Sequence, residues 1–285
     1  MASGHGVPSM VAAWSPAWSA SPGRRRGDRE TRSRPYHPRV SFPPSPPPLP
    51  GVRRVLAVFA HPDDVDFGSA GTVATWVDAG IEVTYLLVTK GEAGSAGGLS
   101  QELLADTRET EQRTAAAVVG VHNVEFLDGY PDGAVYFGHR LRRDITRAIR
   151  RWRPDRVLTN SPLRRWDSMG GPNHPDHLAV GEATVAAVYP DARNRYAHCE
   201  LLTEEGLEPW TVREVWFSGG PSPDHFVDIT ETAERKFTAL RSHASQLPDP
   251  DSTEQMLRKW LGQTALTAGF GEDRLAEAFS IVRNS

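Results

Sequence analysis

A short apolar segment, Val55 to Ala60, ends directly at the sequence His61-Pro62-Asp63-Asp64. An apolar segment of this length, followed at once by polar residues, is typical of a buried β-strand. In open α/β sheets, ligands bind at the carboxyl ends of the strands. The sequence therefore predicts that an imidazole and two neighbouring carboxylates lie at a sheet edge that a ligand can reach.

Further apolar segments alternate with helical patterns over residues 52–190. Leu141, Ile145 and Ala148, for example, share one face of a helix that Pro154 ends. Strands that alternate with helices indicate βαβ units. We therefore predict an α/β fold with a doubly wound, mostly parallel, Rossmann-like sheet and helices on both faces. The expected strands are 54–60, 83–89, 124–127 and 156–160, and the expected helices are 68–79, 100–119, 140–152 and 175–188.

The pattern loosens after residue 190. We expect this part to be a C-terminal extension that covers one side of the sheet, so that residues 51–285 form a single domain. Its expected strands are 212–218 and 226–229, and its expected helices are 230–242, 252–261 and 275–282.

The composition changes sharply near residue 50. Residues 1–50 hold eleven of the 23 prolines and seven arginines against two acids, a formal charge of +5. Because the whole chain carries −4, residues 51–285 carry −9. A segment rich in proline and arginine cannot bury enough apolar surface to offset its chain entropy. We therefore predict that residues 1–50 are a disordered tail.

Several partners are excluded by these patterns. The run Arg24-Arg25-Arg26 has no apolar region after it, so it is not a twin-arginine export signal. The acidic body argues against nucleic acid as a partner. No stretch approaches the roughly 18 apolar residues that span a bilayer. The single cysteine, Cys199, excludes an intramolecular disulfide and fits the cytoplasm. The pattern predicts no particular oligomeric state.

A second polar cluster, His174-Pro175-Asp176-His177, opens a predicted helix more than a hundred residues after the first. Proline suits the first position of a helix, so both histidines fall in the first turn and on the same side. Together the clusters offer two imidazoles and one carboxylate to a divalent ion, and leave a carboxylate and an imidazole for proton transfer. Such donors suit zinc, which lowers the pKa of a bound water from ~15.7 to ~7. The pair of clusters indicates metal-assisted hydrolysis.

Each cluster also has a simpler interpretation. The first can be a turn in which Asp64 caps the next helix. The second can be a helix start in which Asp176 favours the positive end of the helix dipole. The pairing of the two clusters, each at a suitable strand or helix end, favours the functional interpretation.

These residues resemble the PIG-L/LmbE-like zinc-dependent N-deacetylases, which include N-acetylglucosaminyl deacetylases. The resemblance covers roughly residues 52–250. It rests first on the two histidine clusters and is supported by the following segments: Val55 to Gly71, the loop ending near Gly94, Arg108 with Glu111, and Pro131-Asp132-Gly133.

The resemblance implies a role for each residue of the two clusters. His61, Asp64 and His177 match the metal ligands of the family. Asp63 matches the general base, and His174 matches the residue that stabilises the tetrahedral intermediate and protonates the leaving amine. General base chemistry needs a carboxylate within reach of the water, and the oxyanion needs a positive donor opposite it.

Other matches have competing interpretations. Arg108 and Asp132 match positions that hold the sugar. Arg108 can instead lie on a solvated helix face, paired with Glu111, and Asp132 can serve only the turn. The segment His243 to Gln246 looks like a family feature near the site, or else a plain helix end.

Two features depart from the family pattern. Many members have a glutamate where this chain has Val65, and Asp66 follows one place later. The segment Arg164 to Asp167 carries a cation and an indole that either line the substrate mouth or form an exposed loop.

The leading prediction is a zinc hydrolase that removes the N-acetyl group from an amino-sugar conjugate, a small molecule. An amidase for a bulkier sugar-linked amide is the near alternative. Non-haem iron enzymes also use two histidines and one carboxylate. A nucleotide-binding module with Gly68 to Gly71 as its phosphate loop is a third class, which the nearby aspartates disfavour. The loops 90–100, 128–138 and 161–173 are expected to set specificity.

Overall fold

The computed structural model describes residues 48–94, 98–166 and 169–284. The predicted tail, apart from residues 48–50, lies outside the described residues. Every helix in the described segments is too short or too polar to cross a bilayer.

The core is a mixed seven-stranded sheet with the order β3-β2-β1-β4-β5-β7-β6. The first five strands along this order are parallel, and β7 runs antiparallel to both of its neighbours. The strand order reverses between β1 and β4, which is where open α/β sheets bind ligands. The predicted α/β fold is confirmed. The strands are β1 (Arg54–Phe59), β2 (Glu82–Leu87), β3 (Asn123–Phe126), β4 (Arg156–Asn160), β5 (Glu214–Ser218), β6 (His225–Asp228) and β7 (Ala276–Arg283).

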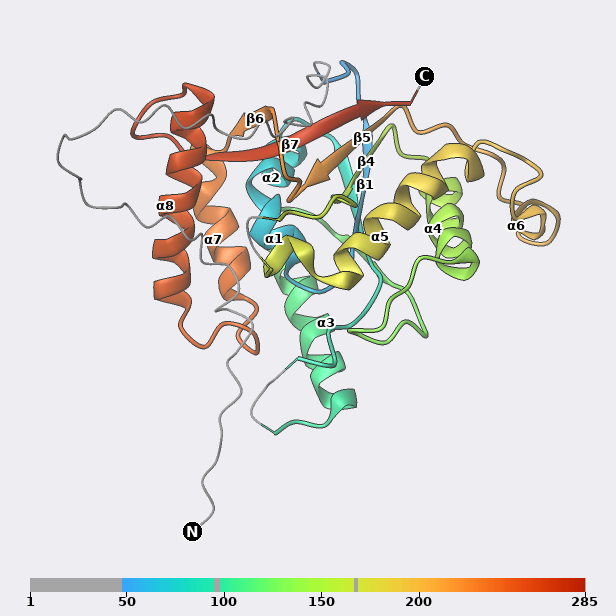
Figure 1. The fold of residues 1–285 in the computed structure, drawn as a ribbon, viewed down its shortest axis with the longest axis horizontal. Helices are drawn as coiled ribbons and strands as arrows, with labels where there is room; N and C mark the ends of the chain where they lie inside the picture. Colours follow the sequence, from blue (N-terminus) through green and yellow to red (C-terminus); the bar gives the residue numbers. More distant parts are fainter. Residues whose placement is uncertain (1–47, 95–97, 167–168, 285) are drawn as a thin grey trace, which may run out of the picture.

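Helices cover both faces of the sheet (Figure 1). Val55, Ala57 and Phe59 of β1 pack with the helices α2 and α3, while Leu56 and Val58 pack with α4 and α5 on the other face. This alternation follows from the two-residue period of a strand. The helices are α1 (Asp64–Gly68), α2 (Ala70–Asp78), α3 (Gln101–Val118), α4 (His139–Trp152), α5 (Pro175–Ala186), α6 (Cys199–Thr203), α7 (Ala233–Arg241) and α8 (Pro250–Ala268), with short helical turns at Gly171–Asn173, Ala187–Asp191 and Thr230–Thr232.

The C-terminal extension differs from the prediction in one element. A helix is expected at residues 275–282, but residues 276–283 form β7, which pairs with both β5 and β6. Its two alanines and Glu277 favour a helix by intrinsic propensity. Glu277, Phe279 and Ile281, however, are all buried at every second position, as in a strand. Sheet pairing on both sides therefore outweighs the local propensity.

Smaller differences concern helix boundaries. The helix expected at 68–79 starts earlier and is divided at Ser69 into α1 and α2. The helix expected at 252–261 extends over the whole of α8, which lies beside α7, β6 and β7 (Figure 1). The short helix α6 was not expected.

A buried ion pair ties the extension to the first helices. The Lys236 ammonium of α7 lies 2.8 Å from the Glu277 carboxylate of β7, and it also donates to the carbonyl groups of Asp66 and Phe67 at 2.7 Å. Glu277 in turn accepts hydrogen bonds from backbone N–H groups in the first turn of α2. A carboxylate at this position satisfies N–H groups that have no partner within the helix. The pair thus fixes α1, α2, α7 and β7 to one another.

We predict that Lys236→Met lowers the free energy of unfolding by about 3–5 kcal/mol, because it leaves Glu277 charged and buried without its cation. The control is Arg235→Met, which breaks the neighbouring exposed pair with Asp78 and costs about 0–1 kcal/mol. Urea denaturation measures both values. If the two substitutions lowered the free energy of unfolding equally, the buried pair would contribute no more to stability than the exposed pair.

Candidate metal and active site

The first histidine cluster lies in a tight turn at the carboxyl end of β1. His61 follows the strand almost directly, and α1 begins at Asp64. The Asp64 carboxylate accepts a hydrogen bond of 2.9 Å from the His61 backbone N–H. Asp63, just before the helix, has φ of 94°, a region that residues other than glycine rarely adopt. The turn therefore holds Asp63 in an unusual conformation.

The second cluster lies at the start of α5, which follows β4. Pro175 occupies the first turn of the helix, as predicted, and His174 is its N-cap. The Nδ1 atom of His174 accepts a hydrogen bond of 3.3 Å from the backbone N–H of Asp176. His177 follows in the same turn and is buried. Since β1 and β4 are neighbours, the two clusters face each other at one sheet edge.

The structure brings the predicted ligand atoms together. The Nδ1 atom of His61 lies 3.1 Å from Nε2 of His177. The Asp64 carboxylate places one oxygen 2.9 Å from Nε2 of His177 and the other 3.5 Å from Nδ1 of His61. The His174 ring is also close, with its centroid 4.8 Å from that of His61. Two nitrogens and a carboxylate thus converge on one point.

Two aspartates hold the opposite side of the His61 ring. Its Nε2 atom lies 3.1 Å from Asp132 and 3.2 Å from Asp176. Asp176 is fully buried and also accepts backbone hydrogen bonds from Gly133 and Val135. Carboxylates that accept a hydrogen bond from one ring nitrogen fix the tautomer and leave the other nitrogen free as a ligand. The contact of Asp176 with His61 was not predicted, although the position of Asp176 between two candidate site histidines was a usable signal.

Asp132 lies in the site, but its carboxylate already contacts other residues of the protein. One carboxylate oxygen contacts His61, and the other accepts a hydrogen bond of 3.1 Å from the backbone N–H of Ala93. The backbone N–H of Asp132 donates to Glu92 at 2.8 Å. A sugar would therefore have to share the Asp132 carboxylate with the protein.

Arg108 is buried beneath the loop that follows β2. Its guanidinium donates to the carbonyl group of Gly91, and a Cβ atom at Gly91 or Gly94 would collide with it. Burial lowers the pKa of Arg108, while the charges of Asp63 and Asp132 act to raise it. The alternative of a solvated helix face is wrong. Glu111, expected as its partner, instead accepts two hydrogen bonds from Ser245.

The ionisable groups of the site perturb one another strongly. Burial, together with the charge of Asp64, raises the pKa of Asp63 to about 7. Burial acts to raise the pKa of Asp64 as well, but the adjacent His177 and His61 outweigh it and hold that pKa below its ordinary value. Burial lowers the pKa of His174, and the other two imidazoles lower it further.

The pKa of His61 shows what charge this site favours. Burial alone would lower it, but the hydrogen bonds with Asp132, Asp176 and Asp64 outweigh burial and raise it well above the ordinary value. The surrounding carboxylates therefore stabilise positive charge at this point.

The donor atoms fit a divalent metal ion. Two overlapping sets have ligand atoms within 4.8 Å of one another, namely His61, His174 and His177, and His61, Asp132 and Asp176. The predicted set replaces His174 of the first set by Asp64. Because Nδ1 of His174 accepts a hydrogen bond from its own helix, its proton lies on Nε2, which is then no ligand. The chemistry of the donors therefore favours Asp64 as the third ligand.

A further polar network lies directly beneath the first cluster. Gln112 of α3 accepts from the Asp63 backbone N–H at 2.8 Å and donates to Asp66 at 2.8 Å. His243 contacts the same Asp66 oxygen at 2.9 Å, and Gln246 donates to the carbonyl group of Pro62 at 3.2 Å. The segment His243 to Gln246 therefore reaches the site, as its resemblance suggested. Nothing in the sequence pattern identified Gln112.

The segment Arg164 to Asp167 is only partly described, since Asp167 lies outside the described residues. Arg165 forms two backbone hydrogen bonds with the Asn173 side chain, at 2.7 and 2.6 Å, directly before His174. Trp166 is 83% exposed, with the Arg164 guanidinium 5.8 Å from its ring. Residues 164–166 thus form a loop in which Trp166 is exposed and Arg165 is tied to the start of the second cluster.

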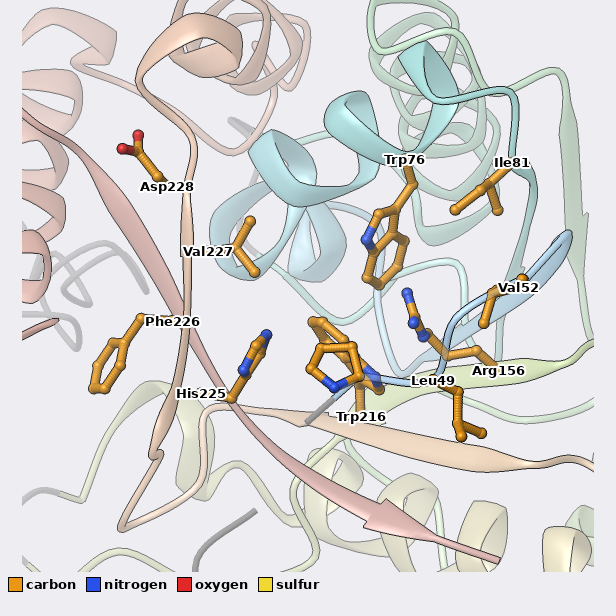
Figure 2. Close-up of a pocket in the computed structure, with 12 residues that line it drawn as sticks. Leu49, Val52, Trp76, Ile81, Arg156, Trp216, His225, Phe226, Val227 and Asp228 are labelled. Carbon is orange, nitrogen blue, oxygen red and sulfur yellow. The ribbon is translucent and has the colours of Figure 1, made fainter. Parts of the chain in front are cut away.

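A hollow of about 440 Å³ lies elsewhere, at the amino ends of the parallel strands. Figure 2 shows Trp76, Trp216 and His225 directed toward one another around it. The two indoles contact each other with centroids 5.1 Å apart, and the Arg156 guanidinium lies beside both, 4.7 and 4.3 Å from their centroids, and is paired with Glu214. Neither set of candidate metal ligands lies there, so this hollow is separate from the site.

Comparisons with known proteins identify a family for the chain. The family model described as GlcNAc-PI de-N-acetylase, PIG-L, matches residues 56–188. The diacetylchitobiose deacetylase of Thermococcus kodakarensis is 34% identical over 203 residues, which are 71% of this chain and 73% of that protein. The 1D-myo-inositol 2-acetamido-2-deoxy-alpha-D-glucopyranoside deacetylase of Rhodococcus jostii is 29% identical over 265 residues, 75% of this chain and 89% of that protein.

A solved structure gives the same result. The N,N′-diacetylchitobiose deacetylase from Pyrococcus horikoshii, complexed with its inhibitor MPG, is similar with a TM-score of 0.74 and 30% identity. The similarity covers 81% of this chain and 84% of the other. The predicted resemblance is confirmed, and the chain belongs to the PIG-L family of N-deacetylases.

Proposed function

We propose that this protein is a zinc-dependent N-deacetylase that hydrolyses the acetamide of an N-acetylated amino-sugar conjugate and releases acetate and a free amine. One observation carries the proposal. The His61 and His177 imidazoles and the Asp64 carboxylate converge within 3.5 Å at a sheet edge, with Asp63 and His174 beside them. The relatives named above, which are deacetylases of acetylated sugars, support this class of substrate.

His61, Asp64 and His177 would hold the metal ion. Two imidazoles and one carboxylate are a donor set typical of catalytic zinc, and they leave a coordination position open. A bound zinc ion supplies Lewis acidity and lowers the pKa of water. Asp132 and Asp176 support the site by accepting the proton of His61 Nε2, so that Nδ1 is directed at His177 and Asp64.

Asp63 acts as the general base in this proposal. Among the described residues, none donates a hydrogen bond to its carboxylate, whereas its backbone N–H and C=O groups are bound by Gln112 and Phe67. A carboxylate that no protein group occupies can take the proton from water as the new C–O bond forms.

His174 stabilises the oxyanion and protonates the leaving amine. Since its Nδ1 atom accepts from the backbone of Asp176, its Nε2 atom carries the proton. A donor in this position can stabilise negative charge on the carbonyl oxygen. To protonate the leaving nitrogen as the C–N bond breaks, His174 must first carry a second proton, on Nδ1, so that it returns to the neutral form when it donates from Nε2. The proton that Asp63 takes from water balances this step.

Arg108 and Asp132 are proposed to hold the sugar. Arg108 lies on α3 beneath the loop that follows β2, Asp132 lies in the loop that follows β3, and the charge of Asp132 acts to raise the pKa of Arg108. The short backbone contact of Arg108 with Gly91 orients its guanidinium. A cytoplasmic location also belongs to the proposal and rests only on the single cysteine.

We predict that His61→Ala and His177→Ala each weaken zinc binding by more than about 100-fold, because each removes a ligand rather than a supporting group. The control is His122→Ala, which changes an exposed histidine outside the cluster. Competition with a chelator of known affinity measures the dissociation constants. Wild-type affinity in either site variant would mean that the ion binds elsewhere.

We predict that Asp63→Asn retains zinc but lowers turnover by about 10²–10⁴-fold, the usual contribution of a general base. Asp106→Asn, on the exposed face of α3, is the control and should keep wild-type turnover. Steady-state kinetics with metal analysis of the same samples measures both quantities. An Asp63 variant with normal turnover would remove the assignment of the base.

The experiment that tests the whole proposal combines metal analysis with a substrate screen. Purified protein is assayed for acetate release from N,N′-diacetylchitobiose and N-acetylglucosaminyl-inositol, and for acid release from analogues with longer acyl groups. We expect one zinc-dependent activity that releases acetate. Release of only the longer acids would favour the amidase alternative, and oxygen-dependent turnover with iron would contradict the proposal.

A further inference from the structure

The peptide bond between Pro62 and Asp63 is held at both of its polar ends by glutamine side chains. Its N–H group, on Asp63, donates to Gln112 at 2.8 Å, and its carbonyl group, on Pro62, accepts from Gln246 at 3.2 Å. Gln112 belongs to α3 and Gln246 to the segment after α7, so two distant parts of the chain grip one peptide plane.

Both glutamines are anchored to the same buried pair, Asp66 and His243. The Gln112 amide nitrogen donates to Asp66 at 2.8 Å, and Nε2 of His243 contacts the same Asp66 oxygen at 2.9 Å. Gln246 contacts the other nitrogen of His243 at 3.4 Å. Gln112, Asp66 and His243 are all fully buried. Because the carboxylate of Asp66 requires the amide nitrogen of Gln112, the Gln112 oxygen must face the N–H group of Asp63.

Gln112 and Gln246 together form a clamp on the Pro62–Asp63 peptide, and this clamp acts on Asp63, the residue whose backbone is strained. Asp63 has φ of 94° and ψ of −28°, a conformation that persists only where the surroundings impose it. The orientation of the Pro62–Asp63 peptide plane sets φ at Asp63 and therefore the direction of its side chain. The clamped peptide lies between His61 and Asp64, so its rotation would move Asp63 relative to both.

We propose that Gln112 and Gln246 are positioning residues that aim the Asp63 carboxylate, with Asp66 and His243 as their anchor. The proposal rests on the assignment of Asp63 as the general base. Neither glutamine contacts the reacting atoms, and both act through the backbone of Pro62 and Asp63. A misplacement of about 1 Å at a reacting group can cost roughly 10²-fold in rate.

The test uses Gln112→Ala and Gln246→Ala, assayed with whichever of N,N′-diacetylchitobiose and N-acetylglucosaminyl-inositol the wild type deacetylates faster. We expect kcat to fall by about 10–100-fold with KM and bound zinc unchanged. The controls are Gln101→Ala and Gln263→Ala, two exposed glutamines on α3 and α8. Gln246 is only partly buried, so its variant tests the proposal even if Gln112→Ala folds poorly.

A double-mutant cycle with Asp63→Asn separates positioning from a general loss of structure. If the glutamines act through Asp63, Gln112→Ala and Gln246→Ala should lower kcat little further once Asp63 is replaced. Full additivity in the cycle would overturn the clamp. Normal turnover in Asp63→Asn would instead contradict the assignment of Asp63 as the base. If Asp63→Asn loses activity while Gln112→Ala and Gln246→Ala keep it, Asp63 remains the base and the positioning role of the glutamines is contradicted.

A structural measurement gives a result that does not depend on substrate. In crystals of Gln112→Ala and Gln246→Ala, we expect the Pro62–Asp63 peptide to rotate and φ at Asp63 to leave the positive region in at least one variant. An unchanged peptide plane in both variants would contradict the proposal.

Discussion

The rest of the site depends on the contacts of the His61 imidazole. This ring lies where β1, the middle one of the five parallel strands, ends between its neighbours β2 and β4. Asp132 and Asp176 lie within hydrogen-bond distance of one ring nitrogen, and the other ring nitrogen faces His177 and Asp64. The ring thus joins the loop after β3, the turn after β1 and the start of α5. A parallel sheet makes this possible because the carboxyl ends of its strands share one edge.

The C-terminal extension does more than cover the sheet. Lys236 and Glu277 fix α1 and α2, His243 contacts Asp66, and Gln246 donates to the carbonyl group of the peptide that precedes Asp63. A strained backbone at Asp63 is therefore held from outside the turn that contains it. Residues far from the two histidine clusters in the sequence therefore contribute to the structure of the turn that contains Asp63.

Much of this arrangement could be predicted from local patterns. An apolar run predicts β1, and the polar residues that follow it predict the first histidine cluster. A proline at a helix start predicts the position of the second cluster. The alternation of strands and helices indicates a parallel sheet, which places both clusters at one edge. Residues 276–283 could not be predicted in the same way, because their helix-forming residues become a strand only through pairing with β5 and β6. Arg108 and Gln112 also depend on tertiary packing, since a polar residue on a helix reads as solvated until its neighbours are known.

The central claim is that one divalent ion binds between the two histidine clusters. Anomalous diffraction from zinc-soaked crystals, recorded on both sides of the zinc absorption edge, tests it most directly. The account predicts a single strong peak about 2.0–2.2 Å from Nδ1 of His61, Nε2 of His177 and an oxygen of Asp64. A peak on the opposite side of the His61 ring, between Asp132 and Asp176, or no peak near His61, would contradict it.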